Sequence, residues 1–359
     1  MQYRDFMKMQ YNRSMTDREI FMKSVAELEE RLTVPTQDLI EMMKRLDGDI
    51  MILGIAGKMG PTMGRLAVNA IKAANVEKKV FGVARFSNPA DRVKMESWGI
   101  ETIACDLLDP EAVKQLPQVK NVIFMAGKKF GTQGSEDQTW AMNVLAPAYV
   151  GNHFKSSRIV AFSTGCVYPL VPVGSCGCSE EVVPEPVGEY SQSCLGRERI
   201  FENCARNNGT EILLYRLNYA IDLRYGVLHD IAANIMEDKP VDNTVGYFNA
   251  IWQGDANRYA LRCLEHCANP CAIMNITGPE TVSVEWAALK LGKLLGKEVR
   301  FKGTPGNQCY LNNSAKMCHT FGYPTVSMET LIRWQAEWIL NGGVSIGKPT
   351  HFEVNNGKF

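Results

Sequence analysis

The chain has 359 residues and carries 39 lysines and arginines against 39 aspartates and glutamates, so its formal net charge is zero. This balance gives no support for binding to nucleic acid or to a membrane surface, because both usually need a basic excess. The sequence has no apolar run long enough to span a bilayer, and its first residues lack the apolar stretch of a secretory signal. We therefore expect a cytoplasmic protein that has neither nucleic acid nor membrane as a partner.

Eleven cysteines in a chain of this length predict buried thiols in a reducing compartment. Two groups are close enough in sequence to be weighed as metal ligands: Cys176 with Cys178, and Cys263, Cys267 and Cys271 with His266. Neither group has the paired C-x-x-C spacing of a structural zinc site, and Pro270 ends the helix that would align the second group. We therefore expect no metal site.

Two amphipathic helices are predicted before residue 49. The first follows a capping box at Thr16–Glu19, and the second begins after Pro35 and ends at Gly48. Their apolar positions recur at helical spacing: Phe21, Val25, Leu28 and Leu32 in the first, and Leu39, Ile40, Met43 and Leu46 in the second. Residues 1–48 are therefore assigned to an N-terminal helical extension. Its apolar faces are buried either on the same chain or on a second subunit, and the sequence leaves both open.

Strand and helix patterns alternate from residue 50 onward. The predicted strands are 50–54, 80–84, 101–105, 121–126, 158–163 and 211–216, and the predicted helices are 63–74, 90–98, 111–116, 139–154, 190–206, 255–266, 284–295 and 328–340. This alternation is typical of an α/β protein with a doubly wound parallel sheet, the Rossmann architecture.

The same patterns divide the chain into regions. We assign residues 49–218 to a dinucleotide-binding Rossmann domain, with a segment near 245–260 that returns to it. Residues 219–345, where the elements become shorter, form mainly a smaller C-terminal α/β substrate lobe, and residues 346–359 form a C-terminal tail.

A glycine-rich turn between the first strand and its helix is the strongest functional signal. Gly54, Gly57 and Gly60 follow an apolar run and precede a helical pattern, with Lys58 and Met59 inside the turn. Small residues at such a turn let the backbone approach a pyrophosphate, and the N-terminus of the helix offers unpaired N–H groups. The sequence predicts that these five residues bind a dinucleotide, although an ordinary structural turn is the alternative.

The end of the second strand decides between the two dinucleotides. An acidic residue there would bind the ribose 2′-hydroxyl of NAD, but this chain has Arg85, which can pair with the 2′-phosphate of NADP. Lys58 would add a second positive charge, although both side chains also fit ordinary solvated cations. The cofactor is predicted to be NADP or NAD, with NADP favoured.

Two further strand ends are candidates for cofactor contacts. Asp106 and Leu107 follow the third strand, where a carboxylate would accept a hydrogen bond from the adenine amino group. Ala126 and Gly127 follow the fourth strand and are small enough to let the nicotinamide ribose pass. A loop cap and a tight turn are the alternative interpretations of these pairs.

Several motifs occur in the order that is found in one family. They are Gly54–Gly60, Asp106–Leu107, Phe124–Gly127, Trp140–Val144, Ser163–Pro169, Tyr190, Arg216–Tyr219, Trp252–Ala256 and Asn275–Gly278. From about residue 49 to 340 the chain resembles an extended short-chain dehydrogenase/reductase, the superfamily of NAD(P)-dependent sugar epimerases, dehydratases and reductases. The resemblance leaves out the two N-terminal helices.

The resemblance implies a reaction and its residues. Tyr190 would be the acid/base and would also contact the cofactor, Thr164 would hydrogen-bond the reacting oxygen, and Asn143 would be the asparagine of the preceding helix. The implied substrate is carbohydrate-like: a sugar, a sugar acid or a nucleotide sugar. The implied assembly is a homodimer.

One position departs from the family pattern. The family usually has a lysine four residues after the tyrosine, where this chain has Cys194, and a neutral thiol supplies no positive charge. Arg197 lies about two helical turns after Tyr190 and would either reach back toward the ribose or be a surface arginine. The acidic partners of a surface arginine would be Glu198 or Glu202. Lys128 and Lys129, after the fourth strand, are the other candidate cations.

Two functions therefore stay open. The first is an NAD(P)-dependent oxidoreductase or epimerase/dehydratase, favoured by the presence of Thr164, Tyr190 and Asn143. The second is a non-catalytic dinucleotide-binding sensor or partner-binding protein, favoured by Cys194 in place of the lysine. The fold alone does not decide between them.

Overall fold

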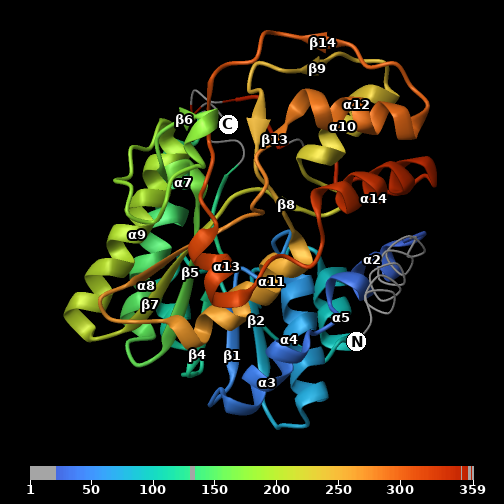
Figure 1. Cartoon of the computed structure of the whole chain (residues 1–359). Helices are drawn as coiled ribbons and strands as arrows, with labels where there is room; N and C mark the ends of the chain where they lie inside the picture. Colours follow the sequence, from blue (N-terminus) through green and yellow to red (C-terminus); the bar gives the residue numbers. More distant parts are fainter. Residues whose placement is uncertain (1–21, 130–133, 349, 355–356, 358–359) are drawn as a thin grey trace, which may run out of the picture.

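The computed structural model describes residues 22–129, 134–348, 350–354 and 357. Its centre is a seven-stranded parallel sheet of order β12-β7-β5-β4-β1-β2-β3 (Figure 1). The strands are β1 (Ile50–Leu53), β2 (Val80–Ala84), β3 (Glu101–Ala104), β4 (Asn121–Phe124), β5 (Arg158–Thr164), β7 (Glu211–Leu217) and β12 (Ala272–Ile276). The prediction of a doubly wound α/β fold is confirmed, and its six strands are found within two residues of their predicted ends.

Helices cover both faces of the sheet, because the strands are nearly continuous apolar runs. Successive residues of a strand point to opposite faces. In β1, Ile50 and Ile52 pack with α4 (Gly60–Ala74), whereas Met51 and Leu53 pack on the face covered by α8 (Ala146–His153) and α9 (Gly188–Asn208). The strand order reverses between β1 and β4, so the turns after these two strands lie at the switch point of the sheet, where ligands bind in such folds.

The other helices around the sheet are α5 (Pro89–Ser97), α6 (Pro110–Lys114), α7 (Glu136–Trp140), α11 (Gln253–Arg262) and α13 (Ala315–Phe321). They differ from the prediction in two ways. Helix α13 was not predicted. The predicted single helix 139–154 is interrupted, because a π-helical segment at Ala141–Leu145 separates α7 from α8. Such segments are frequent at functional sites and leave no periodicity signal in the sequence.

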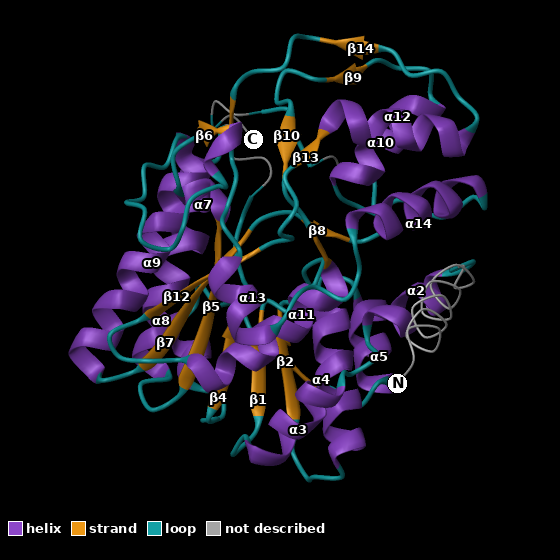
Figure 2. Cartoon of the chain, in the orientation of Figure 1, coloured by secondary structure: helices purple, strands orange, loops and turns teal. Residues whose placement is uncertain are grey.

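A second lobe is built around its own apolar core (Figure 2). Its helices are α10 (Val227–Met236), α12 (Val284–Leu295) and α14 (Met328–Leu340). The short strands are β6 (Val171–Pro172), β8 (Ala220–Ile221), β9 (Val241–Asp242), β10 (Tyr247–Phe248), β11 (Ile251–Trp252), β13 (Val282–Ser283), β14 (Phe301–Lys302) and β15 (Gln308–Cys309). Short 3-10 turns lie at Gly165–Val167, Val173–Ser175 and Cys263–His266.

The region 219–345 is shared between the two lobes. Helix α11 packs against α4, and α13 packs against β12. Strand β12 is the edge strand of the sheet, with Ile276 opposite Leu217 of β7. Strand β12 and helix α13 therefore belong to the sheet and not to the second lobe, although the sequence region that contains them was assigned mainly to a substrate lobe. Their apolar side chains are part of the core of the sheet.

The N-terminal helices are buried on the same chain, which answers the question that the sequence left open. Helix α3 (Gln37–Arg45) packs against α4 beside the sheet, whereas Leu28 and Leu32 of α2 (Val25–Leu32) enter the core of the second lobe. The predicted capping box at Thr16–Glu19 lies outside the described residues. The N-cap of α2 is Ser24, whose hydroxyl accepts from the Glu27 N–H at 3.2 Å.

All eleven cysteines are free thiols, and Cys176 is the exposed one among them. Within the part of the chain that the structure describes, no cluster of three or more His, Cys, Asp and Glu side chains is arranged to hold a metal ion. Over the same residues, none of the helices has both the length and the apolar character that crossing a membrane requires.

Candidate active site

The glycine turn connects β1 to α4 at the switch point of the sheet. Gly54 has φ of +87°, and a Cβ there would lie 2.7 Å from the Ala126 backbone nitrogen, so this glycine is required by the fold. Gly60 is also required, because its Cβ would collide with the Ile55 carbonyl. Gly57 differs: it is exposed, and a Cβ there would approach only the Gly54 carbonyl oxygen, at 3.3 Å. The turn therefore leaves free space at Gly57.

The predicted cofactor residues around this turn have different surroundings. Met59 is the N-cap residue of α4 and is partly buried against the sheet core. Lys58 extends toward the second lobe, where its Nζ lies 3.3 Å from the ring centroid of Tyr225. Burial, followed by the charges of Lys129 and Lys348, lowers the pKa of Lys58 to about 7. Arg85 is exposed directly after β2.

The ends of β3 and β4 carry the remaining predicted cofactor residues. The Asp106 carboxylate accepts from the Leu108 N–H at 3.0 Å, so it caps the loop in the way that the alternative interpretation proposed. Leu107 is buried in the sheet core. Ala126 is buried against the Gly54 turn, and Gly127 is exposed.

Asn143 lies in the π-helical segment and is fully buried. Its amide oxygen accepts from the Lys128 N–H at 2.9 Å and from Arg197 Nη2 at 2.7 Å. Its amide nitrogen donates to the Lys128 carbonyl at 3.1 Å and to the Ser193 hydroxyl at 2.9 Å. These bonds fix both backbone polar groups of Lys128 and connect the segment after β4 to α9. Asn143 therefore has a structural role at this site.

Arg197 is a buried residue, and the prediction of a surface arginine is wrong. It is 5% exposed and donates to the Phe162 carbonyl at 2.8 Å as well as to Asn143. The two acidic neighbours pair elsewhere: Glu198 with Arg216, and Glu202 with Arg199. Helix packing against β5 turns position 197 inward, which helical spacing alone left undecided.

A buried polar network lies behind the predicted catalytic residues. Arg216 is held by both carboxylate oxygens of Glu198, with its Nε 2.9 Å from Oε1 and its Nη2 2.7 Å from Oε2. Ser163 also donates to Glu198, and Arg216 donates to the Tyr168 hydroxyl at 2.7 Å. Tyr168 in turn donates to Asn275 at 2.9 Å. This network ties β5, β7, α9 and β12 together beneath Thr164.

Thr164 ends β5, and Tyr190 lies on the helix that packs against this strand. Thr164 is 8% exposed and accepts from the Cys166 N–H at 3.2 Å. Tyr190 lies in the first turn of α9, which packs against β5 and the following 3-10 turn. Burial raises the pKa of Tyr190 well above its usual value, the Cys194 and Cys166 thiols add to this, and the Arg197 charge opposes it.

Lys129 is the lysine that faces Tyr190. Its Nζ lies 5.9 Å from the ring centroid of Tyr190 and also 5.9 Å from that of Tyr219. Burial lowers the pKa of Lys129, and the groups that act against this are Cys166, Cys194 and Asp230. Tyr219 has a φ of +40°, which is a strained backbone for a bulky residue and is common at functional sites.

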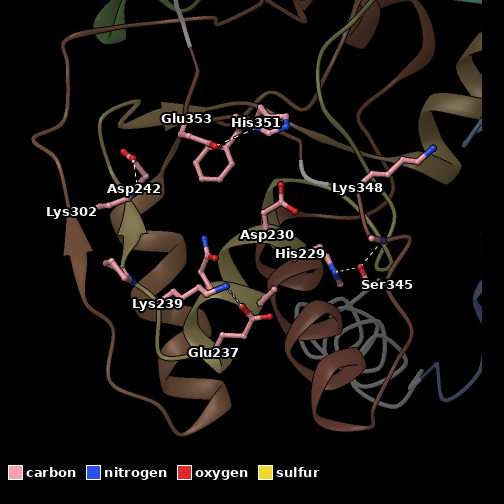
Figure 3. Close-up of a pocket in the computed structure, with 15 residues that line it drawn as sticks. His229, Asp230, Glu237, Lys239, Asp242, Lys302, Ser345, Lys348, His351 and Glu353 are labelled. Carbon is pink, nitrogen blue, oxygen red and sulfur yellow. Dashed lines mark hydrogen bonds and ion pairs between the residues drawn. The ribbon is translucent and has the colours of Figure 1, made fainter. Parts of the chain in front are cut away.

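Sequence reasoning missed a cavity of about 630 Å³ between α10 and the C-terminal tail (Figure 3). Asp230 of α10 faces this cavity and accepts from the Thr350 N–H at 2.7 Å, and His229 bonds the Ser345 hydroxyl at 2.9 Å. Tyr190 and Thr164 are not among the lining residues, so the cavity is not the space around the predicted catalytic pair. No local pattern signalled it, because it forms only when the tail returns to α10.

The tail also reaches the start of α9. A Cβ on Gly357 would lie 2.7 Å from the Gly188 Cα, so the two backbones are in direct contact. Phe352 is 4% exposed in the core of the second lobe. The described part of the predicted tail is therefore packed on both lobes. Its contact at Gly357 is with Gly188, two residues before Tyr190 in the chain.

The chain resembles known proteins in its three-dimensional structure. No protein-family model matches the chain. No curated protein matches its sequence. Among solved structures, UDP-glucuronic acid 4-epimerase from Bacillus cereus, solved with NAD, is 18% identical, with a TM-score of 0.67 over 81% of this chain and 99% of that one. The dTDP-glucose 4,6-dehydratase of Streptomyces venezuelae, also solved with NAD, is 18% identical, with a TM-score of 0.69 over 82% and 97%.

A third similar structure is UDP-glucose 4-epimerase from Thermotoga maritima, solved with UDP-glucose. It is 17% identical, with a TM-score of 0.66 over 82% of this chain and 99% of that one. Nearly the whole of each of these proteins is matched, so both lobes are part of the likeness. The chain therefore has the two-lobed fold of these sugar epimerases and of the dehydratase.

Proposed function

We propose that this chain is an NAD(P)-dependent oxidoreductase or epimerase/dehydratase that acts on a sugar, a sugar acid or a nucleotide sugar. One observation carries the proposal: Tyr190, Thr164 and Lys129 gather at the same edge of the sheet as the open glycine turn. The epimerases and the dehydratase of the same fold act on nucleotide sugars, as their names state. The nearly complete coverage of both lobes supports carrying this substrate class over.

The residues of this chain fit a dinucleotide. Free space at Gly57 lets a pyrophosphate approach the backbone, and the N-terminus of α4 offers unpaired N–H groups. Gly54–Gly60 would hold the pyrophosphate, Asp106 and Leu107 the adenine, and Ala126, Gly127 and Tyr190 the nicotinamide ribose. The bound cofactor supplies hydride exchange with a carbon of the substrate.

Residues of the chain itself transfer the proton and orient the reacting group of the substrate. The Tyr190 hydroxyl exchanges a proton with the oxygen on the reacting carbon, and Thr164 hydrogen-bonds the same oxygen and orients it. Asn143 is saturated by four hydrogen bonds within the protein, so it acts by holding Lys128 and Arg197 rather than by touching the substrate.

Replacing Gly57 by alanine tests the cofactor site. The added Cβ would lie 3.3 Å from the Gly54 carbonyl oxygen and near no other described part of the protein, so the free energy of unfolding should fall by no more than about 1 kcal/mol. The same Cβ would occupy the space that a pyrophosphate needs, so NAD and NADP affinity should fall about tenfold or more. Urea unfolding and fluorescence titration measure the two effects. Unchanged affinity for both dinucleotides would exclude this turn as the binding site.

Replacing Arg85 by alanine tests the preference for NADP. Arg85 is exposed after β2, where its guanidinium can pair with a 2′-phosphate, so NADP affinity should fall about tenfold while NAD affinity changes little. Arg92→Ala is the matched control, since Arg92 is an exposed arginine that pairs with Glu96 on α5. Equal losses of NAD and NADP in Arg85→Ala would remove the argument for NADP.

A non-catalytic dinucleotide-binding sensor is the second candidate, and one observation favours it. Cys194 is neutral and buried where the family has its lysine, and burial raises the pKa of Tyr190. Binding of a dinucleotide without turnover of any sugar, sugar acid or nucleotide sugar would support this candidate. The homodimer and the cytoplasmic location stay predictions, and light scattering of the purified protein tests the first.

A further inference from the structure

The position one helical turn after Tyr190 carries no charge in this chain. Cys194 is 1% exposed, and burial raises the pKa of its thiol, so it is neutral near neutral pH. A phenol that exchanges protons in a buried setting needs a cation nearby, because burial by itself stabilises the uncharged form. In this chain the charge has to come from another position.

Arg197 is one of the described cations whose charge acts on Tyr190, and its guanidinium is committed to other contacts. It donates to the Phe162 carbonyl at 2.8 Å and to Asn143 at 2.7 Å, and it lies 5.6 Å from the ring centroid of Phe124. It also follows Tyr190 by seven residues, which is roughly 10 Å along a helix. These contacts hold Arg197 against the inner end of the site.

Lys129 is a second cation, and it comes from the segment after β4. Its Nζ lies 5.9 Å from the ring centroids of both Tyr190 and Tyr219. The other titratable groups that face this ammonium are Cys166 after β5, Cys194 on α9 and Asp230 on α10. The ammonium of Lys58, on the glycine turn, lies on the side toward the second lobe.

The backbone that carries Lys129 is fixed, and its neighbour Lys128 faces elsewhere. Asn143 bonds both the N–H and the carbonyl of Lys128, at 2.9 and 3.1 Å. The Lys128 ammonium donates to the Ser135 hydroxyl at 2.7 Å and to Gln138 Oε1 at 3.1 Å. Two adjacent lysines thus have separate partners, one at the start of α7 and the other beside Tyr190.

We propose that Lys129, from the segment after β4, is a positioning residue that stabilises the Tyr190 tyrosinate. The inference rests on the proposed function, in which Tyr190 exchanges the proton. The Lys129 ammonium lies over the Tyr190 ring, and a nearby opposite charge favours the ionised form of an acid and lowers its pKa. Removing the Lys129 charge should therefore raise the pKa of Tyr190 and leave about a tenth or less of the tyrosinate at neutral pH.

The test measures Tyr190 itself and needs no substrate. Tyrosines labelled with 13C at Cζ are titrated by NMR from about pH 6, through the ordinary tyrosine pKa and upward to the highest pH at which the fold survives, without and with saturating NAD. Tyr190→Phe assigns the resonance. The variants are Lys129→Gln, Lys129→Arg and the charge-matched control Lys128→Gln, each checked for its melting temperature.

The expected result is a Tyr190 titration displaced upward by about one pH unit or more in Lys129→Gln. Lys129→Arg and Lys128→Gln should follow the wild type, since the first keeps the charge and the second removes one that faces α7. Adding Cys194→Lys to Lys129→Gln should bring the titration back toward the wild type, because it restores a cation one helical turn from Tyr190.

Superimposable Tyr190 titrations in the wild type and in Lys129→Gln overturn the inference, and so does an equal displacement in Lys128→Gln. Failure of the proposed function would look different. If turnover is unaffected by Tyr190→Phe while the Tyr190 titration still depends on Lys129, the electrostatic coupling stands and the acid/base role of Tyr190 falls.

Discussion

Replacing Tyr190 by phenylalanine is expected to reduce turnover by about 10² to 10⁴-fold, the range that a positioned acid/base contributes. Phenylalanine keeps the ring that packs beside Val167, Tyr168 and Cys194 but lacks the hydroxyl that exchanges the proton. Binding of the dinucleotide should change little, because most of its contacts come from the glycine turn. Turnover is followed as the conversion of the sugar substrate to its product, with reduced nicotinamide absorbance added for a net oxidation or reduction, and binding is followed by fluorescence.

A second tyrosine on a helix of the same layer is the matched control. Tyr149 is partly buried on α8, where it packs against the sheet core, and Tyr149→Phe should keep wild-type turnover. Equal turnover in the wild type and in Tyr190→Phe would show that another group moves the proton. In that case the oxidoreductase mechanism proposed for this site would be abandoned, even if the cofactor binds.

Replacing Glu198 by glutamine should lower the free energy of unfolding by about 3 to 5 kcal/mol, the cost of leaving one member of a buried ion pair without its partner. Glu198 is 0% exposed and Arg216 is 2% exposed, and the two are joined by a bidentate pair of hydrogen bonds. Glutamine has nearly the same shape as glutamate, so the loss reports the missing charge rather than a cavity. Urea unfolding measures it.

The control uses the neighbouring surface pair on the same helix. Glu202 bonds Arg199, and their side chains are 27% and 55% exposed, so Glu202→Gln should cost less than about 1 kcal/mol. A double variant, Glu198→Leu with Arg216→Met, should recover much of the lost stability because it removes both buried charges. If Glu198→Gln unfolds at the same urea concentration as Glu202→Gln, the network beneath Thr164 does not stabilise the fold as argued.

The sheet was predictable because its signals are local. Buried strands such as β1 and β4 are short apolar runs bounded by turns, and the helices between them repeat their apolar residues at helical spacing. The edge strand β12 was assigned with the second lobe, because a short apolar run has the same sequence pattern in either lobe. The π-helical segment around Asn143 was not predicted, since one extra residue in a turn shifts the phase of the helical pattern without ending it.

The glycine turn, the order of the motifs and the places of Thr164 and Tyr190 in the chain were predictable, because each follows from residues that are neighbours in sequence. The burial of Arg197 against Asn143, the position of Lys129 beside Tyr190 and the packing of the tail on α10 were not predictable. The surroundings of these side chains depend on elements that are far away in sequence. Their packing turns one of two adjacent lysines inward and leaves no trace in local spacing.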